Sequence, residues 1–192
     1  MKEKMTEHSI RLFEKKGFSE TSISDIVESV GVTKGTFYYY FTSKEQLLMD
    51  IHLAYIDELL SEQERIMLEP GKSCKDKLFD MVLMLLKSIK TKKSSATVFF
   101  REMKNLSDDK LAQILPKRDE FRNKIEQVLI SGIESGELRS NLDASIISFA
   151  ILGVANWSYH WFDPEGEKTE QEVAAIFMGM ILQGIEGDQV TY

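Results

Sequence analysis

The stretch from Thr33 to Phe41, with the sequence TKGTFYYYF, carries the residues best suited to chemistry with a partner molecule. If it is helical, Phe37 and Phe41 lie on one side, because residues four apart share a helix face. The three consecutive tyrosines between them cannot all face inward, so at least two hydroxyls must meet solvent or a partner. The first backbone N–H groups of such a helix, next to Lys34, favour phosphate. The pattern is therefore suited to contacts with phosphate groups.

Residues with enzymatic potential are present, but they form no catalytic pattern. The three histidines, His8, His52 and His160, have no spacing typical of metal ligands. The sequence contains no glycine-rich phosphate loop and no nucleophile motif. We therefore expect no catalytic site, no metal site and no cofactor, and we expect that the protein is not an enzyme.

Composition narrows the setting in which the chain works. The single cysteine, Cys74, excludes an internal disulfide and fits a reducing cytoplasm. The apolar fraction of 43% is sufficient for a folded core. No uncharged apolar run approaches the roughly 18 residues that a membrane span needs, and the first residues lack the apolar core of a signal peptide. We expect a cytoplasmic protein with no membrane partner.

The net charge of −7 is unusual for a protein that binds nucleic acid, but the acidity is uneven. Residues 1–50 carry 7 Lys/Arg against 8 Asp/Glu, a balance of −1. The rest of the chain carries 17 against 23, a balance of −6. Because the first part is not basic overall, non-specific binding to DNA should be weak and salt-sensitive.

Helix signals recur along the whole chain, and no strand-type alternation persists, so the expected fold is all-α with about nine helices. Near the N-terminus the expected helices lie at about 3–16, 22–31, 33–41 and 43–59. The later ones lie at about 75–90, 96–103, 116–136, 143–157 and 169–185. Ser107 can cap a further short helix, and Pro116 is suited to the first turn of the helix that follows it.

The second and third of these helices have the proportions of a DNA-binding helix-turn-helix, joined by a tight turn at Gly31-Val32. The residues from Gly31 to Phe41 and from Ser43 to Leu47 resemble the signature of the TetR family of bacterial repressors. The upstream residues from Gly17 to Val27 fit that signature as well. The resemblance implies a three-helix DNA-binding domain at 1–46 and a C-terminal ligand-binding and dimerisation domain at 47–192.

The resemblance also gives nine residues a place on DNA. Those with implied contacts to base edges or adjacent phosphates are Thr33, Lys34, Gly35 and Tyr39. Those with implied contacts to phosphates alone are Ser22, Thr36, Tyr38, Tyr40 and Lys44. Two alternatives stay open: the ring of Tyr38 or Tyr40 packs in the core without a phosphate contact, and Lys44 is only a solvated residue in the first turn of its helix.

Members of the family dimerise through their last two helices, which form a four-helix bundle with the partner. The sequence suits this arrangement, because the helix after Asp143 is apolar nearly all round and has more apolar surface than one core needs. The expected interface residues are Ile147, Ile151, Val154, Val173, Phe177, Met180, Ile181 and Gly184. The alternative is that both helices only fill the core of their own domain.

A ligand is suggested by the segment from Asn156 to Phe162, which resembles a segment in TetR-family regulators of fatty-acid and sterol catabolism. Those regulators answer to acyl-CoA thioesters, and methionine and aromatic side chains suit a flexible acyl chain. The candidate ligand-binding residues are Met81, Met84, Phe99, Phe100, Arg101, Met103, Phe121 and Trp157. The alternative is that these residues belong to an ordinary core and that Arg101 is a surface or salt-bridged residue.

The expected function is that of a homodimeric repressor that binds a palindromic double-stranded DNA operator. A small-molecule effector, with fatty acyl-CoA as one candidate, would shift the fourth helix and release the operator. A helix-turn-helix protein that lacks an effector, or that answers to a protein partner, remains the alternative.

Overall fold

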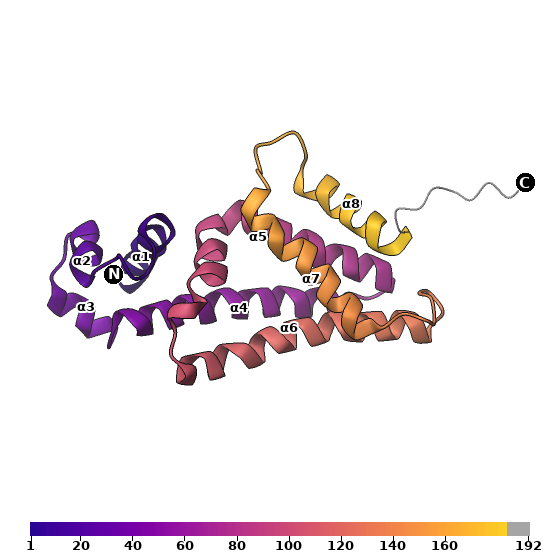
Figure 1. Cartoon of the computed structure of the whole chain (residues 1–192), viewed down its shortest axis with the longest axis horizontal. Helices are drawn as coiled ribbons and strands as arrows, with labels where there is room; N and C mark the ends of the chain where they lie inside the picture. Colours follow the sequence, from indigo (N-terminus) through magenta and orange to yellow (C-terminus); the bar gives the residue numbers. More distant parts are fainter. Residues whose placement is uncertain (184–192) are drawn as a thin grey trace, which may run out of the picture. The chain divides into compact units, whose positions relative to one another are not determined.

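Residues 1–183, which the computed structural model describes, form an all-helical protein (Figure 1). The helices are α1 (Lys2–Lys16), α2 (Ile23–Val30), α3 (Lys34–Tyr40), α4 (Lys44–Leu68), α5 (Cys74–Arg101), α6 (Asp108–Glu134), α7 (Ala144–Trp161) and α8 (Glu170–Gln183). A short 3-10 helix, η1 (Met103–Asn105), separates α5 from α6. The predicted all-α class is confirmed, and this described part of the chain has no strand. None of these helices combines the length and apolarity needed to cross a membrane.

The chain divides into two compact units. The first unit comprises Met1–Ser61 and Lys92–Glu120, and the second comprises Glu62–Thr91 and the residues from Phe121 onward. Helices α4, α5 and α6 each contribute residues to both units. The boundary after residue 46 that the sequence suggests falls inside α4 and stays a prediction.

The first three helices are held together by a small aromatic core and by short turns. Helix α1 contacts α2, and α2 contacts α3. Phe13 of α1 and Phe37 of α3 are fully buried. Gly31 ends α2 with a φ of 73°, a left-handed conformation that glycine adopts without steric cost. Because Thr33 then caps the next helix, α2 and α3 are joined by a tight turn at the position that the sequence predicts.

Two expected helix boundaries are wrong, and the described residues hold eight α-helices instead of about nine. Pro116 lies inside α6 and does not begin a helix. The proline has no N–H for the carbonyl of Ala112, but both residues are exposed, so water can satisfy that carbonyl. The expected break between 90 and 96 is only a kink in α5, where Lys92 has non-helical backbone angles (φ −139°, ψ 36°). Helix formers on both sides let the helix resume.

In the second unit, α7 contacts α8, and each helix buries one stripe of side chains. Ile151 and Ala155 of α7 are buried, as are Val173 and Met178 of α8. The beginning of α5 is fixed by Glu137, whose carboxylate accepts hydrogen bonds at 2.9 Å from the backbone N–H groups of both residues 74 and 75. This carboxylate satisfies backbone donors that a helix N-terminus otherwise leaves open.

Candidate nucleic-acid interface

Helix α3 turns its phenylalanines inward and two of its tyrosines outward. Phe37 and Phe41 are buried and anchor the helix. Tyr38 is 57% exposed and Tyr39 is 82% exposed. Tyr40 is half-buried, and its ring centre lies 4.9 Å from that of Tyr39 in an edge-to-face arrangement. The two exposed tyrosines are what the residue spacing requires, and the structure leaves their side chains accessible to a partner.

The beginning of α3 combines an internal cap with an exposed cation. The Thr33 hydroxyl accepts a hydrogen bond from the Thr36 backbone N–H at 3.4 Å and lies 3.3 Å from the Thr36 hydroxyl. Lys34 and Gly35 are exposed, and the ion pairs among residues 1–183 do not include Lys34. Its ammonium is therefore available for a guanine edge or a phosphate.

Ser22 has a structural role as the N-cap of α2. Its hydroxyl oxygen accepts from the Asp25 backbone N–H at 3.1 Å, and the hydroxyl donates to the Asp25 carboxylate at 2.8 Å. That carboxylate also accepts from the Ser22 backbone N–H, which is the largest cause lowering the pKa of Asp25 to about 2, followed by the Ser22 hydroxyl and Lys16. This reciprocal arrangement is a capping box. A phosphate contact through Ser22 would have to use the oxygen, or replace Asp25 as the hydroxyl's acceptor.

Lys44, in the first turn of α4, ties that helix to the loop before α2. Its Nζ donates to the backbone oxygens of Phe18 and Thr21, both at 2.6 Å, and lies 4.2 Å from the centre of the Phe18 ring. Burial lowers the pKa of Lys44. The residue is therefore neither a fully free phosphate ligand nor a solvated side chain. An ammonium has three N–H donors, so one remains for the predicted phosphate contact.

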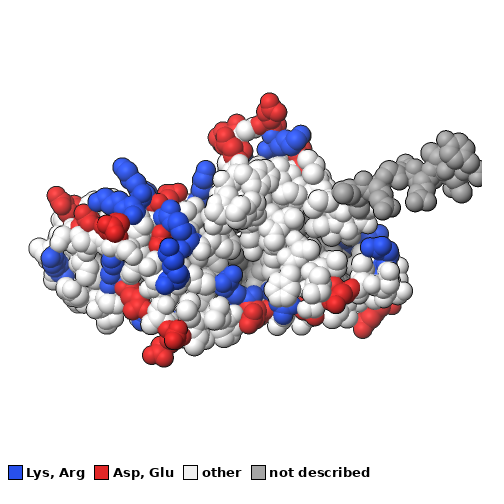
Figure 2. Space-filling view, in the orientation of Figure 1, with Lys and Arg blue, Asp and Glu red and all other residues white. Residues whose placement is uncertain are grey.

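The charges around these helices are of both signs (Figure 2). Lys16 lies 3.3 Å from the Asp25 carboxylate, and Lys2 lies 3.5 Å from that of Asp50. Such partly exposed pairs engage two of the seven cations of residues 1–50 in internal contacts. The weak non-specific binding expected from the sequence stays a prediction.

The end of α5 and the segment after it are hydrogen-bonded to α1 and α4 within the first unit. Arg101, predicted as a ligand-binding residue, donates to the backbone oxygens of Phe13 and Glu14 at the end of α1, the latter at 2.8 Å. Its Nε pairs with the buried carboxylate of Glu102 at 2.7 Å. The Glu45 carboxylate of α4 accepts from the backbone N–H of residue 107 at 2.8 Å. Arg101 therefore acts as a structural tether, and its guanidinium is occupied.

Comparisons with known proteins assign this arrangement to a family. Residues 6–51 match the family model described as bacterial regulatory proteins, tetR family. Residues 71–185, which are more than half of the chain, match the model described as tetracyclin repressor-like, C-terminal domain. The chain belongs to the TetR family. It is a TetR-type DNA-binding transcriptional repressor and not an enzyme, as its sequence predicts.

Relatives and solved structures within the TetR family cover almost the whole chain. The HTH-type transcriptional repressor KstR2 of Mycolicibacterium smegmatis is 27% identical in an alignment of 185 residues that covers 93% of this chain and 87% of that protein. The TetR-family regulator PfmR from Thermus thermophilus is 26% identical, with a TM-score of 0.88 over 95% of this chain and 99% of PfmR. AibR, solved in complex with isovaleryl coenzyme A and operator DNA, is 22% identical, with a TM-score of 0.85 over 94% of this chain and 97% of AibR.

The predicted dimer residues of this TetR-family chain do not all lie on an accessible face. Ile151 and Val173 are buried within their own unit, so as interface residues they are corrected to core residues. Because α7 is apolar nearly all round, helical periodicity does not show which side faces out. The predicted interface residues that remain partly or fully accessible are Ile147, Val154, Phe177, Met180 and Ile181. Gly184 lies outside the described residues.

The predicted ligand residues fall in both units. Phe99, Phe100, Arg101 and Met103 belong to the first unit, and Met81, Met84, Phe121 and Trp157 belong to the second. Met81, Phe99 and Phe121 are buried, whereas Trp157 is 61% exposed. An accessible tryptophan on α7 is suited to a protein interface at least as well as to a closed pocket.

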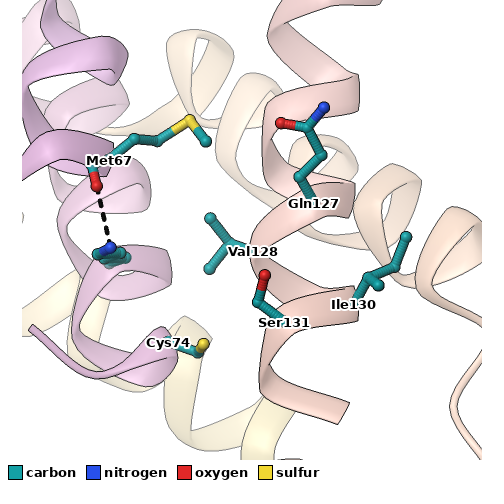
Figure 3. A pocket seen from close by; sticks show the side chains of 7 residues that line it. Met67, Cys74, Gln127, Val128, Ile130 and Ser131 are labelled. Carbon is teal, nitrogen blue, oxygen red and sulfur yellow. Dashed lines mark hydrogen bonds between the residues drawn. The ribbon is translucent and has the colours of Figure 1, made fainter. Parts of the chain in front are cut away.

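A hollow of about 370 Å³ lies in the second unit and contains none of the predicted ligand residues. Figure 3 shows Met67 of α4, Cys74 of α5, and Val128 and Ser131 of α6 around it. The Lys77 ammonium at its wall donates to the Met67 backbone oxygen at 2.9 Å. Burial raises the pKa of the Cys74 thiol, and the negative charge of Glu137 raises it further. This cysteine is therefore not activated as a nucleophile.

Two polar residues of the first unit are not among the predicted site residues, although the sequence allows His52 to line a ligand pocket. His52 is fully buried, and Arg118 is half-buried without a carboxylate partner in the described chain. The sequence offers no signal for Arg118, because it is a single polar residue on a helix that also has other polar residues. For the same reason the sequence favours a polar helix-face position for His52, which its full burial contradicts. Only the fold shows that both adjoin the ring of Phe99.

Proposed function

We propose that the chain is a homodimeric repressor that binds a palindromic operator through α3 and leaves it when a small apolar effector binds. The observation that carries this proposal is the pair of exposed tyrosines beside the free Lys34, on a helix anchored by two buried phenylalanines. Tyr39 is 82% exposed and follows Tyr38, which is 57% exposed, so both side chains are accessible to a partner.

The contacts to DNA would come from the capped beginning of α3 and from its tyrosines. Thr33, Lys34, Gly35 and Tyr39 would meet base edges or adjacent phosphates. Thr36, Tyr38, Tyr40, Ser22 and the remaining donor of Lys44 would meet phosphates. Lys34 is the cation suited to a guanine edge, and hydroxyls discriminate less sharply between bases.

The dimer would form through the accessible stripes of α7 and α8. Large apolar residues exposed on them are Ile146, Phe149, Trp157, Trp161, Ile176 and Met180. On α7 they recur at helical spacing with the exposed Gly153 between them, and the surface over both helices is mostly uncharged in Figure 2. An exposed stripe of this size on one helix pair favours association with a second copy over contact with water.

The effector would be an acyl-CoA thioester or a related apolar acid. One support is the segment Asn156 to Phe162, which resembles a segment in TetR-family regulators that answer to acyl-CoA thioesters. The other is AibR, whose structure holds isovaleryl coenzyme A. Effector binding would move α4, and the two helix-turn-helix domains would lose their spacing of about 34–36 Å, one turn of DNA. The chain would act in the cytoplasm, where operator and acyl-CoA are both present.

Selection of bound fragments from the native genome tests the proposal. We expect enrichment of one palindromic site that the full chain binds in a gel shift at stated salt, and a weaker complex with the Lys34→Ala variant. Addition of octanoyl-CoA should release the fragment. Failure to enrich any site would contradict operator binding, and equal operator affinity with and without a panel of acyl-CoAs would contradict acyl-CoA as effector.

A further inference from the structure

Arg118 on α6 is a half-buried cation for which the chain supplies only weak partners. Its Nη1 lies 3.1 Å from the sulfur of Met103, and its Cζ lies 5.9 Å from the centre of the Phe99 ring. No carboxylate among residues 1–183 pairs with it. A thioether is a weak acceptor, and a distance near 6 Å is the limit of a useful cation–π contact. A charge that is partly removed from water normally has a stronger partner than these.

The neighbouring charged groups are already occupied. The buried Glu102 carboxylate accepts from Arg101 Nε at 2.7 Å and from Asn105 Nδ2 at 2.8 Å. Lys117, the residue before Arg118, pairs with Asp57 at 2.5 Å. Asp119 raises the pKa of Arg118 through its charge but forms no ion pair with it, while burial lowers that pKa more strongly. Arg118 therefore keeps its donors for a group that the described chain does not provide.

His52 adds an unpaired polar atom beside the same ring. Its side chain is fully buried, and its ring centre lies 5.3 Å from that of Phe99. Nδ1 lies 2.9 Å from the Leu48 backbone oxygen, whereas Nε2 has no hydrogen-bond partner in the described part of the chain. Burial is the largest cause that lowers the pKa of His52, and backbone contacts with Leu48 and Phe99 oppose it. The charges of Arg118 and Glu102 also act on His52, in opposite directions, which places Arg118 within electrostatic reach of the ring. A buried unpaired nitrogen costs free energy unless a ligand satisfies it.

We propose that Arg118 binds the anionic group of an apolar effector, a carboxylate or a phosphate, with His52 Nε2 as a second polar contact. Arg118 can hold either anion with two parallel hydrogen bonds, because the guanidinium is planar and presents its N–H groups as a fork. Phe99 and Tyr55 are buried with their ring centres 4.9 Å apart, so the apolar part of the effector would contact them only after these side chains move. This inference rests on the proposed effector response, and it adds Arg118 to the candidate ligand-binding residues.

The test compares Arg118→Met with Lys117→Met, which removes a positive charge one residue away. Calorimetric titration of the full chain would use octanoate for the carboxylate, octanoyl-CoA for the phosphates, and 1-octanol as the uncharged probe. Thermal unfolding without any probe would be recorded for all three proteins. Because Arg118 has no strong partner, its replacement should leave the melting temperature unchanged or higher.

We expect at least one anionic probe to bind the wild type saturably and at least tenfold more weakly to Arg118→Met. Lys117→Met should change that affinity less than twofold, and 1-octanol should not distinguish the three proteins. Whichever anionic probe depends on Arg118 identifies the group as carboxylate or phosphate. The inference is overturned if neither anionic probe binds the wild type, if Arg118→Met binds them equally well, or if its melting temperature without probe falls by several degrees.

Parallel gel shifts with the selected genomic site keep this inference separate from the proposed function. A wild type that binds the site but no anionic probe would retain operator binding and overturn only the anion site. A wild type that binds the probe through Arg118 but no DNA site would overturn operator binding and leave the anion site standing.

Discussion

At the scale of single residues, the hydroxyl of Tyr39 makes the most direct prediction. Tyr39→Phe removes one oxygen from a side chain that is 82% exposed, so the fold should lose no measurable stability. If the hydroxyl contacts a phosphate, its loss should weaken operator binding by about tenfold or more, since a hydrogen bond to a charged group contributes roughly 1.5–3 kcal/mol. Fluorescence anisotropy with the selected site measures the change. Affinity equal to that of the wild type would assign Tyr39 no polar contact to DNA.

His52 predicts how stability depends on pH. Burial holds its folded-state pKa below 6.5, so the unfolded chain binds more protons as the pH falls through that value. The neutral His52 therefore contributes fully to the free energy of unfolding above pH 6.5. This contribution falls as the pH drops below 6.5, by at most about 1.4 kcal/mol per pH unit. The loss stops at the folded-state pKa.

Urea unfolding between pH 7.5 and 5 measures this dependence, with His52→Phe as the comparison. That variant keeps a ring against Phe99 and removes the titrating group. Asp25, with its pKa lowered to about 2, contributes its own pH dependence only at lower pH. The same pH slope in wild type and variant would show that His52 is not the titrating group.

At the scale of elements, Lys44 should stabilise the fold, whereas Lys34 should contribute little to its stability. Lys44→Met leaves the carbonyls of Phe18 and Thr21 without their donor, and should cost about 1–2 kcal/mol of stability after allowance for partial exposure. Lys34→Met changes an exposed side chain and should cost less than about 0.5 kcal/mol. Chemical denaturation of both variants measures the difference. Equal stability of the two would contradict the tether between α4 and the loop before α2.

Gly132 marks the place where α6 approaches its own following turn most closely. A Cβ at this position would lie 2.7 Å from Leu138 Cδ1, 2.9 Å from its Cγ and 3.1 Å from Cys74 Cβ. Gly132→Ala should therefore cost about 1–3 kcal/mol through overpacking. Leu138→Val removes a carbon from the crowded side, so urea unfolding of the double variant should show less than the sum of the single costs. Additive costs would mean that the turn moves away without resistance.

The elements show where sequence reasoning succeeds and where it fails. The helix-turn-helix was predictable because its signals are local: a left-handed glycine at 31, a capping threonine at 33 and two phenylalanines one turn apart. The prediction that a helix begins at Pro116 was wrong, because the missing hydrogen bond of the proline costs little on an exposed part of α6. The dimer stripe was misassigned at Ile151 and Val173, since α7 has apolar residues on all sides and only packing decides which of them are buried. Arg118 and His52 meet through tertiary contacts with Phe99, which no local pattern encodes.

At the scale of the whole molecule, the account depends on two copies of the chain acting together. One copy would cover half of a palindrome, and the apolar stripe that includes Trp157 and Phe149 would remain in water. A charge in the centre of that stripe should prevent association without unfolding the chain, because Trp157 is 61% exposed in the single copy. Trp157→Glu is therefore the variant that links dimerisation to operator binding.

Sedimentation velocity of the labelled operator with wild type and with Trp157→Glu is the measurement that tests this central claim most directly. We expect two wild-type chains on each palindrome, and a folded monomeric variant that binds no operator at the concentration where the wild type saturates it. A wild type that binds the site as one chain, or a Trp157→Glu variant that still binds as a dimer, would contradict the account.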